Sequence, residues 1–415
     1  MNKQSTKGAF PDAAASPWFS FGRPERALLG IWLALRILTL FWAAMTSSLR
    51  PRTEREQAIA LWPPSTPIGS WFERVLLAPW ERWDVEYFLR IVQHGYSTSD
   101  GTAQFHPLLP WLAMPTAWLS GQPLLGLMLV SSLASALLLL AFERLARLDL
   151  NAEAARASTL LLLFFPSTYV IFAPYTEGLW LLCAVLCFLC ARHGKWWLAG
   201  VAGAFATLTR QQGLFLALPL AWELWEASGR DWKKAIAGWR NWLALALIPF
   251  GFLVWIVYRA LALSDLNVSF NNFQGLIYSL LISPSATKVV PVQAFIWPWE
   301  ALWRALTILR DKPTLDTFID LSLGAVFVIV SALAWRGMRI SYRIFVAVIA
   351  LLSFSLYTGP FYPYMGLPRH LLLCFPVFIG LANINVGRYR SLLLAAGILG
   401  SMFLLYFHTL HMWIP

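Results

Sequence analysis

The amino-acid sequence predicts an all-α integral membrane protein, a multi-pass bundle of about eleven transmembrane helices. Three observations support this prediction: an apolar composition, a series of long apolar runs, and basic residues sorted between those runs. Of the 415 residues, 58% are hydrophobic and the mean hydropathy is +0.60, whereas soluble domains contain about 45–50% apolar residues. The cysteines lie inside the apolar runs and are expected to be buried hydrophobic residues: Cys183, Cys187, Cys190 and Cys374.

The apolar runs are long enough to cross a bilayer core of about 30 Å. The first run, 27–45, follows Lys3, Lys7, Arg23 and Arg26, so residues 1–26 are expected to be a polar cytoplasmic N-terminus. The first helix would then act as an uncleaved signal-anchor, and residues 27–415 would form one transmembrane domain. The other runs are 124–141, 157–173, 179–191, 196–208, 214–225, 242–263, 319–335, 344–358, 370–382 and 391–408.

Basic residues predict the orientation of the chain in the plasma membrane. When the runs alternate across the bilayer, five short loops fall on the cytoplasmic side, and all five are basic. The net charge of +11 is therefore a topology signal, and no nucleic-acid partner is expected. The basic residues of these loops are Arg144, Arg147, Arg156, Arg192, Lys195, Arg230, Lys233, Lys234, Arg240, Arg336, Arg339, Arg343, Arg388 and Arg390.

Two large loops, 46–120 and 264–316, are expected outside the cell. Within the first, residues 81–93 predict an amphipathic helix with Asp84 on its polar face, ended by Gly95. Pro107 and Pro110 then predict a short interfacial or re-entrant helix. Polar residues of the other external segments gather on the same side: Tyr175, Glu177, Arg210, Gln211, Arg369 and His370.

An aspartate surrounded by arginines has the parts needed for glycosyl transfer from a lipid phosphate. A carboxylate such as Asp84 can act as general base on an acceptor hydroxyl. Arginines such as Arg210 and Arg369 bind phosphate and stabilise the charge of the leaving group. Arg36 lies inside the first apolar run, so it should face the protein interior and meet a carboxylate or a lipid phosphate.

Ordered motifs in these segments resemble those of the glycosylphosphatidylinositol mannosyltransferase II family, whose bacterial members belong to the GT-C superfamily of polytopic glycosyltransferases. The resemblance runs from about residue 36 to 382 and implies a GT-C-type bundle with a large first extracytoplasmic loop. It also implies a polyprenyl- or dolichyl-phosphate mannose donor, transfer on the extracytoplasmic or lumenal face, and Asp84 as the catalytic acid–base residue. The motifs are Trp83-Asp84, Tyr87-Phe88-Leu89-x-Ile91, Gly95-Tyr96, Phe105-x-Pro107-Leu108-x-Pro110, Ala173-Pro174-Tyr175-Thr176-Glu177, Leu208-Thr209-Arg210-x-x-Gly213 and Pro368-Arg369-His370-Leu371 with Phe375-Pro376.

The chain departs from the family pattern where His106 replaces a Phe and Leu109 replaces a Tyr. We interpret His106 as a packing or hydrogen-bonding residue rather than a metal ligand. The motifs require no cofactor, although a divalent metal is compatible with them; an Asp84/Glu86 metal pair would need an extended backbone. Candidate substrate-binding residues are Arg36, Trp83, Glu86, His94, His106, Tyr175, Glu177, Arg210, Gln211, Arg369 and His370.

Structural roles are the alternatives for these residues. Asp84 could pair with Arg82 or Arg90, Glu177 could interact with a helix dipole, and the arginines could snorkel to the interface. The sequon at Asn267 is a short pattern that arises easily by chance.

Two other classes of function are open. A transporter or flippase of lipid-linked sugars should show polar segments at the membrane midplane and internal repeats, and a structural subunit would not need Asp84. The polar groups here gather at one face without repeats, which favours an enzyme with a lipid-linked sugar donor and a lipid or glycan acceptor. Residues Asn271, Asn272, Trp297 and Trp299 of the second loop suggest a lid or an acceptor contact.

Overall fold

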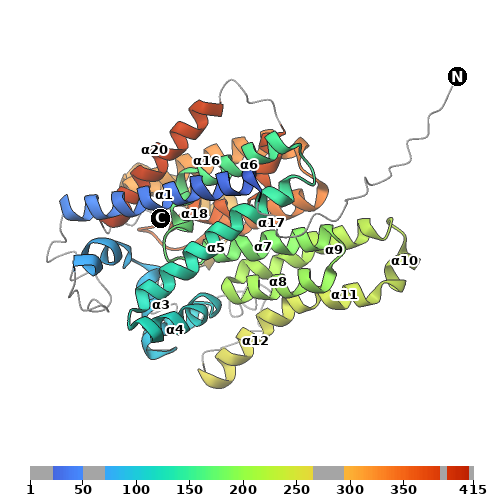
Figure 1. The fold of residues 1–415 in the computed structure, drawn as a ribbon, viewed down its shortest axis with the longest axis horizontal. Helices are drawn as coiled ribbons and strands as arrows, with labels where there is room; N and C mark the ends of the chain where they lie inside the picture. Colours follow the sequence, from blue (N-terminus) through green and yellow to red (C-terminus); the bar gives the residue numbers. More distant parts are fainter. Residues whose placement is uncertain (1–21, 50–70, 265–293, 384–389, 411–415) are drawn as a thin grey trace.

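The computed structural model describes residues 22–49, 71–264, 294–383 and 390–410, and most of them are helical (Figure 1). Asn267, Asn271 and Asn272 lie outside the described residues. In the described part, five helical segments are long and apolar enough to cross a membrane. They are α1 (Arg23–Leu49), α5 (Pro123–Ala146), the pair α11 (Trp239–Leu245) and α12 (Leu247–Ala262), α16 (Leu315–Ala334) with η6 (Trp335–Gly337), and α20 (Arg390–Thr409).

Each remaining apolar run also corresponds to helical structure, but in shorter or broken segments. Pro166 separates α6 from η4, and Pro376 begins α19 after α18 has ended, because proline lacks the N–H that would continue a helix. The number of about eleven crossings therefore stays a prediction. The segments are α6 (Ala152–Leu163), η4 (Pro166–Ile171), α7 (Glu177–Arg192), α8 (Trp196–Thr209), η5 (Gln211–Leu216), α9 (Ala217–Ala227), α17 (Ile340–Ser355), α18 (Leu367–Leu372) and α19 (Pro376–Ala382). A further short helix, α10 (Trp232–Ala237), lies between two of the runs.

The first loop folds into short helices, and the expected amphipathic helix is among them as α3 (Asp84–His94). Its start was predicted three residues too early, because Trp83 has a φ of 55°, which a helix cannot continue through. Gly95, with a φ of 77°, ends α3 as expected. The other elements are η1 (Glu73–Leu77), η2 (Ala78–Trp80), η3 (Thr102–Gln104) and α4 (Leu108–Ser120), which contains Pro115.

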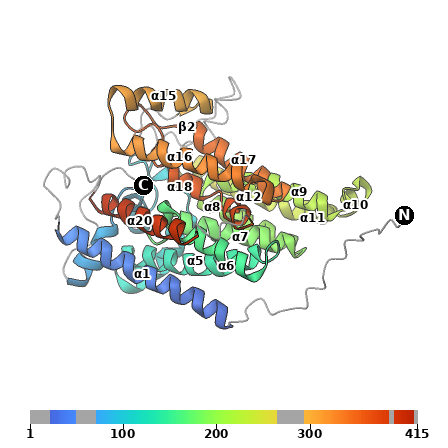
Figure 2. The ribbon, with the colours of Figure 1, turned by 90° about the horizontal axis from the view of Figure 1, so that it is seen from above.

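The second loop contributes a small sheet and one helix in its described part. Strand β1 (Ala294–Phe295) pairs antiparallel with β2 (Leu356–Tyr357), and α15 (Pro298–Asp311) follows β1. Trp297 and Trp299 stack with ring centroids 5.0 Å apart, and both are exposed. Figure 2 shows α15, α16 and α17 on one side of the bundle and α1, α5 and α6 on the other, with α18 between them.

Ion pairs connect the basic loops that are predicted to lie on the cytoplasmic side. Asp149 lies 3.0 Å from Arg192 and 3.9 Å from Arg339, and Arg339 lies 3.2 Å from Glu226, which also pairs with Arg230. Four of the five basic loops thus meet at one end of the molecule. The elements α3 and α4 lie toward the opposite end of the long axis from α10 (Figure 1).

Candidate active site

A charged cluster joins four of the external segments through direct contacts. Arg369, on α18, donates from Nη1 to Asp84 Oδ2 at 2.7 Å, and its Nε lies 3.2 Å from Glu177 Oε1. Arg210, between α8 and η5, donates from Nη1 to the same Glu177 oxygen at 2.6 Å. Arg210 Nη2 contacts His370 Nδ1 at 3.2 Å. Residues 285 positions apart in the chain are therefore in hydrogen-bond contact at this site.

Asp84 is placed for contact with a ligand. Its carboxylate begins α3, where the helix dipole favours negative charge, and a quarter of the side chain, 25%, is exposed. Arg369 occupies Oδ2, whereas Oδ1 accepts no hydrogen bond from the described residues. The preceding Trp83 has an unfavourable positive φ for a bulky residue, and such strain is concentrated at functional sites.

Glu177 holds the two arginines together. Its side chain is 1% exposed at the start of α7, and Oε2 has no hydrogen-bond partner among the described residues. A buried carboxylate needs opposite charge close by, and here two guanidinium groups share Oε1. The Thr176 hydroxyl also accepts from Arg210, at 2.8 Å. Two carboxylates and two guanidinium groups make the cluster balanced in charge before any ligand binds.

The contact with Arg210 fixes the tautomer of His370. Because a guanidinium group only donates, His370 Nδ1 must be the acceptor and lacks a proton. In the neutral ring the proton then lies on Nε2. On the other side of the cluster, Arg369 lies over the ring of Tyr175, 5.2 Å from its centroid, and Tyr175 contacts the ring of His408. Tyr175 is therefore part of the packing that fixes Arg369.

Arg36 faces the interior, where a carboxylate or a lipid phosphate was expected as its partner; its partner among the described residues is a backbone carbonyl. Its Nη1 donates to the carbonyl of Phe172, and its guanidinium lies 5.6 Å from the ring centroid of Trp80. The carbonyl is available because Phe172 follows the last turn of η4, where carbonyls lack helical partners. In the described part of the chain, no ion pair joins Arg36 to Asp84 or Glu177.

Two further candidates of the first loop, Glu86 and His94, lie on α3. Glu86 is half-buried, two residues along α3 from Asp84, so it points to a different side of the helix. His94 is exposed at the C-terminal end of α3, roughly 15 Å from Asp84 along the helix axis. Burial, with the nearby charges of Asp84, Glu86 and Asp100, raises the pKa of Tyr87, which therefore stays protonated.

His106 lies in the first loop with its side chain inside the protein. Nδ1 donates to the Thr207 carbonyl at 2.6 Å, and the ring packs against Phe252 and Trp255. Burial, assisted by the positive charge of Arg259, lowers the pKa of His106 to about 3, although the hydrogen bond to Thr207 opposes this shift. The ring is therefore neutral at physiological pH. Among the described residues, no group of three or more His, Cys, Asp or Glu side chains could hold a metal ion.

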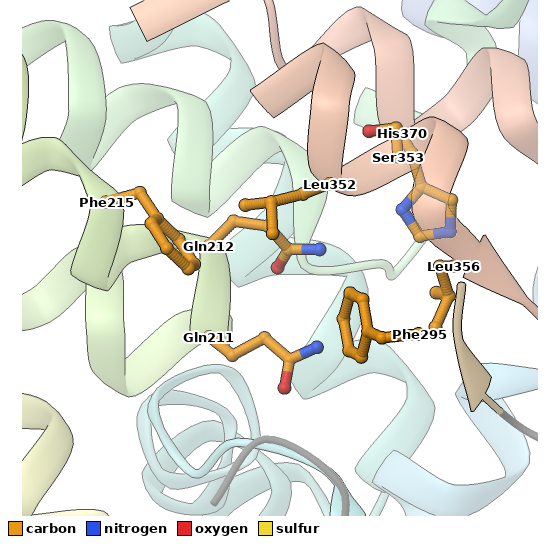
Figure 3. Close-up of a pocket in the computed structure, with 8 residues that line it drawn as sticks. All are labelled: Gln211, Gln212, Phe215, Phe295, Leu352, Ser353, Leu356 and His370. Atoms are coloured by element: carbon orange, nitrogen blue, oxygen red, sulfur yellow. The ribbon is translucent and has the colours of Figure 1, made fainter. Parts of the chain in front are cut away.

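Gln211 and His370 meet in a cavity beside the charged cluster. Figure 3 shows Gln211, Gln212 and Phe215 from η5 facing Phe295 from β1 and His370 from α18. Leu352, Ser353 and Leu356 complete the lining. The cavity adjoins the cluster because Arg210 contacts His370 and directly precedes Gln211.

Two residues near the site were missed in the sequence. Asp320 on α16 is 3% exposed and accepts from the backbone N–H groups of Gly366 and Leu367, where α18 begins. An acidic residue inside an apolar run is itself a signal of function, and Asp320 lies inside the run 319–335. His408 is fully buried between the rings of Tyr169 and Tyr175, but it stands at the end of an apolar run without a motif.

The architecture defines the class of this protein as a multi-pass membrane bundle of the GT-C type. A solved structure of ArnT from Cupriavidus metallidurans bound to undecaprenyl phosphate aligns with a TM-score of 0.50 and 14% sequence identity. The alignment covers 89% of this chain and 62% of ArnT. At this level of identity the similarity establishes the fold, and it confirms the predicted GT-C bundle.

The family follows from the sequence. A family model described as Mannosyltransferase (PIG-V) matches residues 25–281, and the chain belongs to this family. GPI alpha-1,6-mannosyltransferase 2 of Rattus norvegicus is 31% identical over 205 residues, and the Mus musculus protein is equally similar. These matches cover 46% of this chain and 41% of each relative. These matches confirm the resemblance seen in the motifs. They span less than half the length of each relative.

Proposed function

We propose that this protein is a glycosyltransferase that moves a mannosyl residue from a lipid-linked mannosyl phosphate to an acceptor hydroxyl. The observation that carries the proposal is the contact of Asp84 with Arg369 in a cluster that also holds Glu177 and Arg210. Membership of the PIG-V family supports mannose as the sugar. The undecaprenyl phosphate bound to ArnT supports a polyprenyl or dolichyl phosphate as the carrier.

In this proposal Asp84 is the general base. Its free oxygen, Oδ1, takes the proton of the acceptor hydroxyl while the hydroxyl oxygen attacks the anomeric carbon. The bond between that carbon and the phosphate oxygen breaks on the opposite face, so the configuration inverts. The proton ends on Asp84, the mannosyl group on the acceptor, and the electron pair of the broken bond on the lipid phosphate.

Arg210 and Arg369 are proposed to stabilise the phosphate as it leaves. Each guanidinium group carries five N–H donors, so contacts with Glu177 and Asp84 leave donors for phosphate oxygens. Preorganised donors are effective because they need no reorganisation when charge develops. Glu177 provides this preorganisation by binding both arginines. Tyr175 and His370 would support the same two side chains.

The other candidate residues are proposed to contact substrate at the edges of the site. Trp83 and Glu86 flank Asp84 in sequence, His94 is exposed at the far end of α3, and His106 is buried with its ring bonded to the Thr207 carbonyl. Arg36 is proposed to act near the donor lipid through its position on α1. We further propose that the site faces the extracytoplasmic side of the plasma membrane, with the N-terminus in the cytoplasm.

Transfer of labelled mannose tests this function. Purified protein in detergent is given undecaprenyl-phosphate mannose carrying labelled mannose, with lipid extracts of the host as the acceptor pool. A labelled product that is new by mass is expected, and its mass identifies the acceptor. In proteoliposomes, movement of intact donor across the bilayer without a new product would instead indicate a flippase and contradict the proposal.

A further inference from the structure

The short helix α10 exposes large apolar side chains at the end of the molecule where the basic loops meet. Figure 1 shows α10 at one end of the long axis, between α9 and α11. Trp232 and Ile236 are four residues apart, so they share one face of α10, and they are 70% and 71% exposed. Trp239, at the start of α11, is also exposed. Exposed apolar side chains that are grouped in this way mark a contact surface.

The basic residues beside this face lack carboxylate partners. Lys233, Lys234 and Arg240 are exposed, and none of them forms an ion pair with another described residue. Arg230, by contrast, has a carboxylate partner 2.9 Å away. The nearby Asp231 carboxylate caps α10, accepting from the backbone N–H of Lys233 at 2.8 Å. The positive-inside rule explains the side on which these three cations lie, but it does not explain why they are unpaired.

Contacts with the neighbouring helices hold α10 in place. Trp242 Nε1, on α11, donates to the carbonyl of Ala235 at 3.2 Å. The ring of Trp232 lies 4.4 Å from the ring of Trp225, on α9, between centroids. Ala235 is buried, so this side of α10 faces the protein. A fixed helix therefore presents the apolar and the basic side chains.

The position of α10 in the chain places it at a bilayer surface. The apolar segment Trp239–Ala262, which is long enough to cross a membrane, begins directly after Gly238, where α10 ends. Basic clusters next to the cytoplasmic end of a membrane span are attracted to anionic lipids. Short helices that combine tryptophan with lysine lie in the plane of the interface. An anionic lipid surface satisfies both groups at once, because its phosphates meet the cations and its acyl chains meet the apolar side chains.

We propose that α10 lies in the headgroup layer of the membrane and binds anionic phospholipids. Lys233, Lys234 and Arg240 contact the lipid phosphates, and Trp232 and Ile236 insert between the acyl chains. The lipids belong to the leaflet at the basic end, which the positive-inside rule assigns to the cytoplasm. The surface lies at the other end of the molecule from the candidate active site and does not depend on the proposed function.

Lipid titrations of the purified protein test the basic residues. Native mass spectrometry in an uncharged detergent measures the affinity for phosphatidylglycerol, which is anionic, and for phosphatidylcholine, which is zwitterionic. The variant Lys233→Gln/Lys234→Gln/Arg240→Gln should bind phosphatidylglycerol about fivefold more weakly for each charge removed. Its affinity for phosphatidylcholine and its unfolding temperature should match wild type.

A matched variant controls for the loss of charge itself. Arg304→Gln/Arg310→Gln/Lys312→Gln removes three exposed cations from α15 and the residue that follows it. This variant should keep the affinity of wild type for phosphatidylglycerol. Equal losses in the two triple variants would show that net charge, and not α10, attracts the lipid, and would contradict the proposal.

The position of the helix is measured separately with a fluorescent label. The native cysteines are buried, so bimane on Ile236→Cys reports from this face alone. Ala237→Cys is the matched control, because Ala237 is exposed about 100° further round the same helix. In vesicles of phosphatidylglycerol and phosphatidylcholine, spin-labelled lipid should quench bimane more strongly at position 236, and aqueous iodide should quench it more strongly at position 237.

Two results would overturn the proposal. One is an unchanged affinity of the Lys233→Gln/Lys234→Gln/Arg240→Gln variant for phosphatidylglycerol, or an equal loss for phosphatidylcholine. The other is quenching at position 236 by iodide and not by spin-labelled lipid, since the face would then be open to water, as a protein-docking surface would be. If the triple variant unfolds, Lys234→Gln alone should show the fivefold loss.

Discussion

Asp84, Glu177, Arg210 and Arg369 depend on one another for charge balance at the site. Removing one member of a buried pair leaves the other charge without a partner, which costs more than the pair contributes. The same arrangement explains why the arginines remain fixed without a ligand. A phosphate would then meet guanidinium groups that are already oriented.

Arg369→Ala should therefore destabilise the protein by about 3–5 kcal/mol, because Glu177 is left with less opposite charge. Thermal unfolding in detergent measures this loss. Arg310→Ala is the control, since Arg310 and Asp311 form an exposed pair that solvent screens. The double variant Arg369→Ala/Glu177→Gln should recover part of the loss; strict additivity of the two changes would contradict the coupling.

His106 should make the protein sensitive to acid. The folded-state pKa of about 3 lies below the value of about 6.5 in an unfolded chain. The unfolded state therefore binds the extra proton between these values, and stability falls as the pH drops from about 6.5 toward 3. His106→Phe should flatten this acid limb of the unfolding temperature. An unchanged slope would show that His106 is not a source of the sensitivity.

Residue types at the site could be predicted from the sequence, whereas their pairing could not. Asp84, Glu177, Arg210 and Arg369 stood out as polar groups of external segments in an apolar chain. That Arg369 binds two carboxylates at once depends on how α18 packs against α16, α17 and η4, which no local pattern encodes. The partner of Arg36 could not be predicted either, because it is a backbone carbonyl with no sequence signature.

Among the secondary-structure elements, α18 brings the residues of the site together. It is only six residues long, carries Arg369 and His370, and packs in the centre of the bundle. Asp320 of α16 accepts from the first N–H groups of this helix, at 3.3 Å from Gly366 and 3.1 Å from Leu367. Through these contacts the position of α18 is fixed by a neighbouring helix.

Asp320→Ala should displace α18 and lower transfer, since removal of a buried acceptor costs about 1–3 kcal/mol. Asp320→Asn retains one acceptor oxygen and should restore part of the activity. Rates of mannose transfer and donor binding, measured together, check this prediction. A role confined to stability would instead lower the unfolding temperature of both variants and leave the rate per folded molecule unchanged.

Element types were predicted well, and their boundaries less well. Long apolar runs located α1, α5, α16 and α20, but the start of α3 depends on the positive φ of Trp83, which no propensity favours. The cavity was also beyond prediction, because Phe295 reaches it through a two-residue strand that pairs only in the folded chain.

In the whole molecule, the two ends carry different groups of charged residues. One end carries the network of Asp149, Arg192, Arg339 and Glu226 that joins the basic loops, and the other carries the cluster at Asp84. The positive-inside rule assigns the basic end to the cytoplasm. The proposed reaction would then take place on the outer side.

Cysteine labelling tests this orientation. The native cysteines are buried, so an introduced cysteine at an exposed position reports its own side. A membrane-impermeant maleimide should label Ser99→Cys in intact cells, because Ser99 is exposed in the same loop that carries Asp84. Ala227→Cys, exposed at the end of α9, should react only after lysis. The reverse pattern would place the site in the cytoplasm.

Turnover in Asp84→Asn tests the proposed catalytic role of Asp84 most directly, because the substitution keeps the shape of the side chain and removes the base. Labelled mannose transfer should fall at least about a hundredfold, with donor binding retained. Asp311→Asn, which alters an exposed carboxylate paired with Arg310 at 2.7 Å, should keep wild-type turnover. Transfer by Asp84→Asn at a rate close to wild type would contradict the assignment of Asp84 as the catalytic base.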